Sequence, residues 1–229
     1  MLDILFKMFD SQKLHDEKYR IARESGMSGW GGNSRIEKIP TTIRDRFLSF
    51  PDLMSSGDLL EIGCGAGNVS IELTKLGYRV LGVDFSVSAI EWAQENAKKL
   101  SLEIDFRVAN VTNLSACEDA FFDIVYDGNC IHCLIGDERK KTYSEIKRVM
   151  KKGGIFFLSS LCVTNAEAQF PKDFDCETAI LYEGKFPFRY IPTPNALEKE
   201  LVDHGFVVRQ KFIRSGQPFG HVHFHASVI

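Results

Sequence analysis

The sequence predicts an α/β fold in which a mostly parallel sheet is wound on both faces by helices. From residue 59 onward, short apolar runs alternate with stretches of helical periodicity, a pattern typical of parallel strands joined by right-handed crossovers. Three glycines stand at alternate positions directly after the first run, in LLEIGCGAGNVS. An aspartate closes the second run, RVLGVD. These observations predict an α/β domain with a ligand-binding turn after its first strand.

The apolar runs indicate seven strands. The first five alternate with helical stretches, and the last two are separated by a short connection, so we expect those two to be antiparallel neighbours. The expected strands are residues 59–64, 79–84, 104–110, 122–127, 155–161, 206–213 and 221–229.

Four helices are expected between these strands. Ser86 and Thr193 are suitable N-caps for two of them, and the Gly153–Gly154 pair is expected to end a third. The expected helices are residues 68–77, 86–100, 137–152 and 193–205.

The chain is expected to divide into two parts. Residues 1–57 contain an amphipathic helical stretch and the glycine-rich GMSGWGGN, which predict a helical cap or lid. Residues 58–229 are expected to form the main domain. Within it, the aromatic-rich residues 162–192 are predicted to line a substrate pocket, with a satellite core beneath a long loop as the alternative.

The composition narrows the possible partners and locations. The formal net charge is −3, so no broad basic field favours nucleic acid or an anionic membrane. No apolar run is long enough to span a bilayer. The opening residues do not resemble a secretory signal, and six scattered cysteines are expected to be thiols. We therefore expect a cytoplasmic protein, and the composition disfavours a nucleic-acid partner. The sequence also lacks an N-P-P-Y-type run and a basic appended domain, which favours a small-molecule acceptor.

The spacing of the glycines argues against two common ligands. A dinucleotide turn requires G-x-G-x-x-G, whereas here Gly63, Gly65 and Gly67 alternate. A phosphate-binding P-loop would end in Gly-Lys-Ser/Thr, which is missing. Asp84 lies about twenty residues on, where a ribose-binding carboxylate belongs. Phe85 directly after it offers a flat apolar face for a purine.

At this point the sequence resembles the class I S-adenosylmethionine-dependent methyltransferases. The resemblance covers residues 59–161 well and the closing helix and strands more loosely, and it rests on four stretches at the family's spacing. The family implies a Rossmann-like, doubly wound, three-layer αβα fold with seven strands, of which the last is antiparallel. The four stretches are LLEIGCGAGN, VLGVDFS, FRVANVTNL and FFDIVYDGNCIHCLIGDERKKTYSEIKRVMKKGGIFFLS.

The resemblance implies a role for each matching residue. Asp84 would hold both ribose hydroxyls of the cofactor, and Phe85 would flank its adenine. Asn110 stands where the family often has aspartate facing the adenine amino group, and its amide oxygen still accepts. A weaker resemblance to the thiopurine and tellurite-resistance branch implies Trp30 as a lid. The cofactor residues implied are Trp30, Glu61, Gly63, Cys64, Gly65, Asp84, Phe85, Asn110, Val111, Asp127 and Gly128, with Asn129 beside them.

Methyl transfer needs alignment and exclusion of water, and a base only where the acceptor carries a proton. His132, just past the fourth strand, is the candidate base, with packing beneath the loop as the alternative. His221 is the second candidate if its strand face opens to the substrate. His221, His223 and His225 alternate along one face, but no further ligand type completes a metal site, so no metal is expected. Cys130 and Cys133 flank His132 and are expected to be small buried thiols.

The sequence therefore predicts a methyltransferase that uses S-adenosylmethionine, releases S-adenosylhomocysteine and methylates O, S or N of a small molecule. Three alternatives remain open. They are a protein or tRNA methyltransferase, a non-catalytic protein that keeps the cofactor fold, and a NAD-dependent oxidoreductase, which the missing glycine disfavours.

Overall fold

The computed structural model describes residues 2–30, 32–50 and 53–228, and for residues 2–10, 35 and 48 it describes only the backbone. The chain forms two compact units, Met1–Val111 and Thr112–Ile229.

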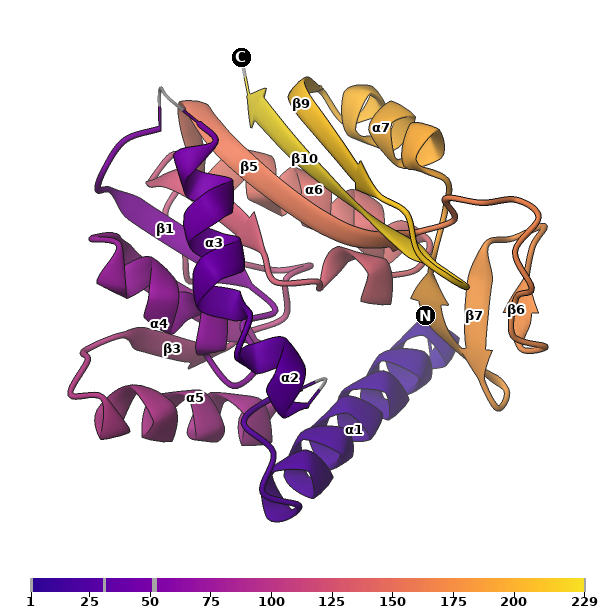
Figure 1. The fold of residues 1–229 in the computed structure, drawn as a ribbon, viewed down its shortest axis with the longest axis horizontal. Coiled ribbons are helices and arrows are strands. Elements are labelled where there is room, and N and C mark those ends of the chain that lie inside the picture. Colours follow the sequence, from indigo (N-terminus) through magenta and orange to yellow (C-terminus); the bar gives the residue numbers. More distant parts are fainter. Residues whose placement is uncertain (1, 31, 51–52, 229) are drawn as a thin grey trace. The chain divides into compact units, whose positions relative to one another are not determined.

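The first unit contains three parallel strands in the order β3-β2-β1. Helices α4 and α5 connect them in sequence, as the alternation predicted (Figure 1). The unit begins with α1, which packs on α5, and with α3, which packs on α4. Its elements are α1 Leu2–Glu24, α2 Asn33–Ile36, α3 Ile39–Leu48, β1 Asp58–Ile62, α4 Asn68–Lys75, β2 Arg79–Asp84, α5 Val87–Lys99 and β3 Asp105–Val108.

The second unit contains four strands in the order β4-β5-β10-β9. Strand β10 is antiparallel to both of its neighbours, which confirms the expected antiparallel last strand. Helices α6 and α7 pack against this sheet, where Tyr143 and Phe156 contact Phe206 (Figure 1). The elements are β4 Phe122–Asp127, the 3-10 turn η1 Ile131–Cys133, α6 Asp137–Val149, β5 Met150–Cys162, α7 Pro194–Asp203, β9 Phe206–Arg214 and β10 Gly220–Val228.

Two helix starts follow the predicted caps. The Ser86 hydroxyl accepts from the Ala89 amide at the start of α5. The Thr193 hydroxyl accepts from the Ala196 amide at the start of α7, where Pro194 occupies the first turn. Each cap satisfies an amide that the helix itself leaves without an acceptor.

The predicted helix over residues 137–152 is too long. Helix α6 ends at Val149, and residues 150–154 already belong to β5, where Met150 pairs with Phe122 of β4. Gly153, expected to end the helix, instead has φ +78° within the strand. The run Met-Lys-Lys-Gly-Gly has a composition typical of helix ends, but strand pairing decides its conformation.

Residues 163–192 form a second, small sheet that the sequence did not predict. Its antiparallel strands are β6 Phe174–Asp175, β7 Ile180–Glu183 and β8 Phe186–Tyr190 (Figure 1). Phe170 and Phe174 pack with Phe219 as a local aromatic cluster.

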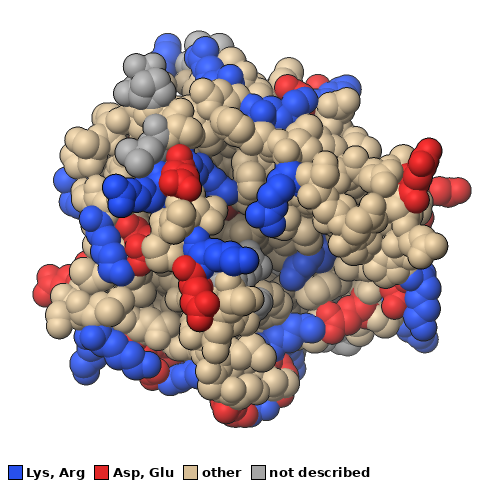
Figure 2. All heavy atoms as spheres, in the orientation of Figure 1, with Lys and Arg blue, Asp and Glu red and all other residues tan. Residues whose placement is uncertain are grey.

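Charges of both signs are scattered over the face that Figure 2 shows, in agreement with the small formal net charge of −3. Among the described helices, none combines the length and the apolar character needed to cross a membrane.

Candidate functional site

Asp84 is the central polar group of the first unit. It ends β2 and is only 5% exposed. Its Oδ2 accepts from the Gly65 amide at 3.0 Å, and its Oδ1 accepts from the Ser86 amide at 2.9 Å. A carboxylate offers about four lone-pair sites, so these bonds leave capacity for further donors. The side chain therefore ties the glycine turn to the carboxyl end of β2.

Burial controls the charge of Asp84. The pKa of this carboxyl is raised to about 6, mainly by desolvation and to a smaller extent by the charge of Asp16. Hydrogen bonds from the Ser86, Gly65 and Phe85 amides oppose that rise in pKa. A ligand that brought further donors or a positive charge would favour the ionised form.

The alternating glycines adopt the backbone conformation of the turn and also leave room for neighbouring side chains. Gly65 has φ +53°, and a Cβ there would lie 2.5 Å from the Tyr19 hydroxyl of α1. Gly67 has φ +76°, and a Cβ there would lie 2.8 Å from Phe106 and 2.9 Å from Ala93. The third glycine thus lets α4 begin close to α5 and β3, a role that spacing alone did not reveal.

Two other predicted residues of the turn are buried around it. Glu61 is 1% exposed and accepts a hydrogen bond from the Ser70 hydroxyl of α4. This contact fixes the start of α4 to β1. Cys64 packs in an apolar cluster with Ala93 and Phe106.

The turn after β3 lies beside Asp84. The Ala109 amide donates to the Asp84 carbonyl oxygen at 2.9 Å. Asn110, which follows, is partly exposed, and Val111 is 6% exposed. The structure therefore brings the predicted adenine-side residues next to the predicted ribose acid.

Helix α1 packs over Phe85 and the glycine turn. The sequence predicted a helical segment before the sheet but not these contacts. The Gln12 side chain donates to the Phe85 carbonyl oxygen at 2.7 Å, and the His15 ring lies edge-on to Phe85 at 5.2 Å. Trp30 stacks on His15 with ring centres 5.7 Å apart, and its ring lies tilted against that of Tyr19 at 4.8 Å. Trp30 thus belongs to an aromatic cluster between α1 and the glycine turn.

Asp16 fastens α1 to the amino end of α5. Its Oδ1 accepts from the Ser86 hydroxyl at 2.7 Å and from the Ser88 amide at 2.9 Å, and its Oδ2 accepts from the Ser88 hydroxyl at 3.0 Å. A negative charge at a helix amino terminus is favourable, so Asp16 acts as a cap supplied by another helix. No local pattern marks this residue, because the contact joins residues about seventy positions apart.

In the second unit, Asp127 ends β4 and is fully buried. It accepts from the amides of Cys130, Ile131 and Ser159 at 2.6, 3.2 and 3.3 Å. Burial raises the pKa of this carboxyl to about 7, against the lowering effect of these bonds. Gly128 follows, and Asn129 accepts from the Ser159 hydroxyl at 3.3 Å. Asp127 therefore organises the turn that carries His132.

A buried arginine holds the same turn from the other side. Arg139 of α6 donates to the Ile131 carbonyl oxygen at 2.5 Å and to that of Leu134 at 3.3 Å. Its guanidinium also makes two hydrogen bonds to Glu200 of α7, at 2.7 and 2.6 Å. His132 between these anchors is 4% exposed. The sequence did not single out this arginine, because charged residues surround it in the helix.

The histidines of β10 share one face, as their alternation predicted. The rings of His221 and His223 stack at 6.2 Å, and both residues are half-buried. His225 is 1% exposed and packs against Phe157 at 4.5 Å. Within the described part of the chain, no group of three His, Cys, Asp or Glu side chains is placed to hold a metal ion.

The prediction that Cys130 and Cys133 are buried is wrong, since both are half-buried. Their turn contacts both β5 and β8.

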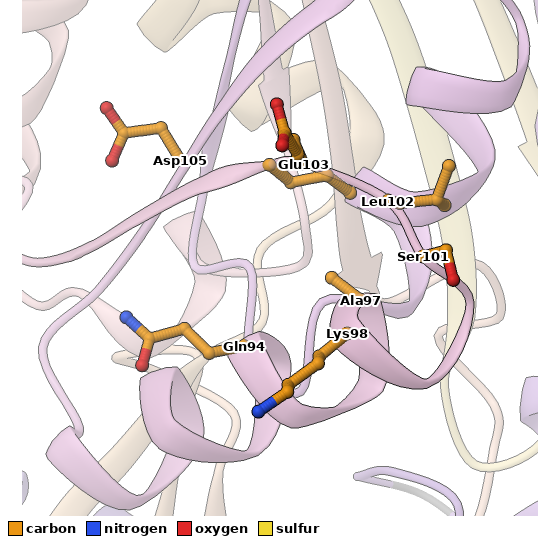
Figure 3. A pocket seen from close by; sticks show the side chains of 8 residues that line it. Gln94, Ala97, Lys98, Ser101, Leu102, Glu103 and Asp105 are labelled. Atoms are coloured by element: carbon orange, nitrogen blue, oxygen red, sulfur yellow. The ribbon is translucent and has the colours of Figure 1, made fainter.

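A shallow depression lies elsewhere on the first unit (Figure 3). Gln94 and Lys98 of α5 and Asp105 at the start of β3 line it. This is the amino end of β3, whereas Asp84 stands at the carboxyl end of β2. The depression contains none of the predicted site residues.

The structure is an α/β fold in which the buried carboxylate of Asp84 joins the glycine turn to the end of β2. Residues 60–158 match the family model described as "Methyltransferase domain". Residues 60–158 therefore form a methyltransferase domain of the class I S-adenosylmethionine-dependent type, and the cofactor predicted from the sequence is the methyl donor of that class.

Two curated relatives and one solved structure illustrate the similarity. Over 147 residues the chain is 34% identical to a ribosomal protein L11 methyltransferase of Dictyoglomus thermophilum, covering 64% of this chain and 44% of that protein. Over 103 residues it is 34% identical to a ubiquinone biosynthesis O-methyltransferase of Pelagibacter ubique, covering 45% of this chain and 41% of that protein. The chain thus spans less than half the length of these two relatives.

The solved structure shares the fold. It is that of a SAM-dependent methyltransferase from Methanosarcina mazei, with a TM-score of 0.68 and 22% identity, covering 82% of this chain and 97% of that one. This match confirms the Rossmann-like, seven-stranded, mostly parallel sheet.

Proposed function

We propose that this protein transfers the methyl group of S-adenosylmethionine to an oxygen, sulfur or nitrogen of a small-molecule acceptor. The observation that carries the proposal is Asp84, a buried carboxylate at the end of β2 that already holds the Gly65 amide. Its remaining lone pairs suit two vicinal ribose hydroxyls.

The neighbouring residues support the same assignment. Phe85 supplies an apolar face for adenine, and Asn110 and Val111 follow β3 beside Asp84. Gly63 and Gly65 carry no side chains, so the backbone of the turn can come close to the methionine part of S-adenosylmethionine. Asp127 and Gly128 are assigned to that part as well. Trp30 on α1 is assigned to the cover of the nucleoside.

The cofactor supplies a methyl group on a cationic sulfur, which leaves without protonation. The protein's own task is to hold the acceptor in line and to exclude water. His132, held between Asp127 and Arg139 in a rigid turn, is proposed as the base for an acceptor that carries a proton. His221 is the second candidate for this role.

A protein acceptor is the second candidate function. The 34% identity to a ribosomal protein L11 methyltransferase favours it, because that relative's name gives a protein as its substrate. The similar identity to a ubiquinone O-methyltransferase favours a small acceptor. The net charge of −3 gives no support to a nucleic-acid acceptor.

Calorimetry with S-adenosylhomocysteine tests the cofactor site. We expect Asp84→Ala to weaken binding about tenfold or more, since a charge-assisted pair of hydrogen bonds is lost. Asp105→Ala, which removes an exposed carboxylate one strand away, is the matched control and should bind normally. Unchanged affinity in the Asp84 variant, or stabilisation by NADH in place of the nucleoside, would refute the site.

Incubation with methyl-labelled cofactor tests the acceptor class. Label in a phenol, thiol or amine panel supports the small-molecule proposal. Label confined to proteins of a cell extract would replace it with the second candidate.

A further inference from the structure

The turn after β4 places two cysteines within reach of each other. The Cys133 amide donates to the Cys130 carbonyl oxygen at 2.8 Å, which closes a four-residue turn. The Cα atoms at the ends of such a turn lie less than about 7 Å apart, within the range that a disulfide spans. Both residues are half-buried thiols.

An arginine of the small sheet approaches one of these sulfurs. Arg189 of β8 donates through Nη1 to the Cys133 Sγ, and its guanidinium lies 4.1 Å from the centre of the Phe188 ring. That ring holds the guanidinium in place by a cation–π contact. A fixed positive charge beside a sulfur favours the thiolate, which is the reactive form of cysteine.

The surroundings of Cys133 differ from those of the buried cysteines. Burial raises the pKa of the Cys162 thiol to about 11, so that side chain stays protonated and inert. Cys133 combines partial exposure, a neighbouring cation and a second thiol three residues away.

We propose that Cys130 and Cys133 form an oxidation-sensitive thiol pair, with Cys133 as the nucleophile and Cys130 as the resolving thiol. The Cys133 thiolate attacks one oxygen of hydrogen peroxide, giving a sulfenic acid and, after proton uptake, water. The Cys130 thiol then attacks the sulfenic sulfur, so that the S–S bond forms and a second water leaves. Two electrons pass from the thiols to the peroxide.

Peptide mass spectrometry of the intact chain after limited peroxide treatment and alkylation tests the pair. We expect loss of two hydrogens from the peptide that contains both cysteines, ahead of any oxidation at the exposed Cys176. In Cys130→Ser, the sulfenic acid should accumulate at Cys133 and react with a dimedone probe. This readout does not depend on methyl transfer, so it stands or fails separately from the proposed function.

A pair of arginine variants tests the role of the Arg189 guanidinium. Arg189→Met should slow alkylation of Cys133 on the order of tenfold. Arg214→Met removes an exposed arginine from β9 and should leave the rate unchanged. Equal reactivity of Cys133 and Cys176, no disulfide between Cys130 and Cys133, or an unaltered rate in Arg189→Met would each overturn the proposal.

Discussion

At the scale of single residues, Asp84 shows what sequence spacing can predict. A carboxylate about twenty residues after a glycine turn indicated a ribose acid, and the structure places it at the end of β2 beside that turn. Spacing did not indicate that the same oxygens accept from Gly65 and Ser86, or that burial raises the pKa to about 6. Those features depend on neighbours that only folding supplies.

The raised pKa of Asp84 predicts a pH-dependent affinity for the cofactor product. Ligand hydroxyls donate to the ionised carboxylate, so binding is full above the pKa of about 6 and declines as pH falls through it. At pH 5 about a tenth of the protein would be competent, so the dissociation constant should be about tenfold higher than at pH 7.5. Calorimetry at the two pH values measures the dissociation constant. In Asp84→Asn this constant should change little between pH 5 and pH 7.5. A flat profile in the unmodified protein would contradict the assignment.

At the scale of elements, α1 shows where sequence reasoning ends. A helix was expected before the sheet, but its register on α5 depends on Asp16, Gln12 and Tyr19, which no local pattern distinguishes from surface residues. Helices α5 and α7 were predictable because Ser86 and Thr193 act within their own first turns. Helix α6 was predicted too long because pairing of Met150 with Phe122 lies outside local sequence.

The contacts of Asp16 predict that its replacement by alanine weakens the attachment of α1 to α5. Asp16→Ala removes the cap at α5, so α1 should loosen, at a cost of about 1 kcal/mol for a partly exposed cap. Amide hydrogen exchange in residues 11–24 should accelerate. The pKa of Asp84 should also fall, because the Asp16 charge helps to raise it, so the affinity profile should move to lower pH. Glu17→Ala, on the exposed side of the same helix, is the control. Identical exchange in the two variants would show that Asp16 does not anchor α1.

At the scale of the whole molecule, the alternation of apolar runs and helical stretches predicted the strands of the main sheet. The short final connection and the family resemblance predicted the antiparallel last strand. A continuous apolar run is visible in the local sequence, so the buried strands could be located. The small sheet of residues 163–192 could not be predicted. Its strands are short, and apart from the buried Phe174 and the exposed Phe186 their residues are half-buried, so no alternation marks them. Contacts such as Arg139 to Glu200 and Arg189 to Cys133 join distant segments and are equally invisible in sequence.

Both units bury a carboxylate, and this predicts how the stability of the whole chain depends on pH. The pKa values of Asp84 and Asp127 are about 6 and about 7, above the ordinary value of 3.8. Between pH 5 and 7.5 these two carboxyls therefore bind more protons in the folded protein than in the unfolded chain, and their contribution to the free energy of unfolding falls as pH rises. The two groups together would remove up to about 4 kcal/mol over this interval. Carboxyls with lowered pKa values, such as those of Asp16 and Glu145, titrate below their ordinary values of 3.8 and 4.5. They therefore do not change the free energy of unfolding between pH 5 and 7.5.

Urea unfolding at pH 5, 6, 7 and 7.5 measures that dependence, with the midpoint expected to decrease along the series. Asp84→Asn cannot ionise at residue 84, so its midpoint should fall less steeply, with only the share of Asp127 remaining. S-adenosylhomocysteine should raise the midpoint more at pH 7.5 than at pH 5, because it binds the ionised form of Asp84. A midpoint that changes with pH equally in Asp84→Asn and in the unmodified protein would mean that burial does not raise the pKa of Asp84, and the nucleoside site would lose its electrostatic basis.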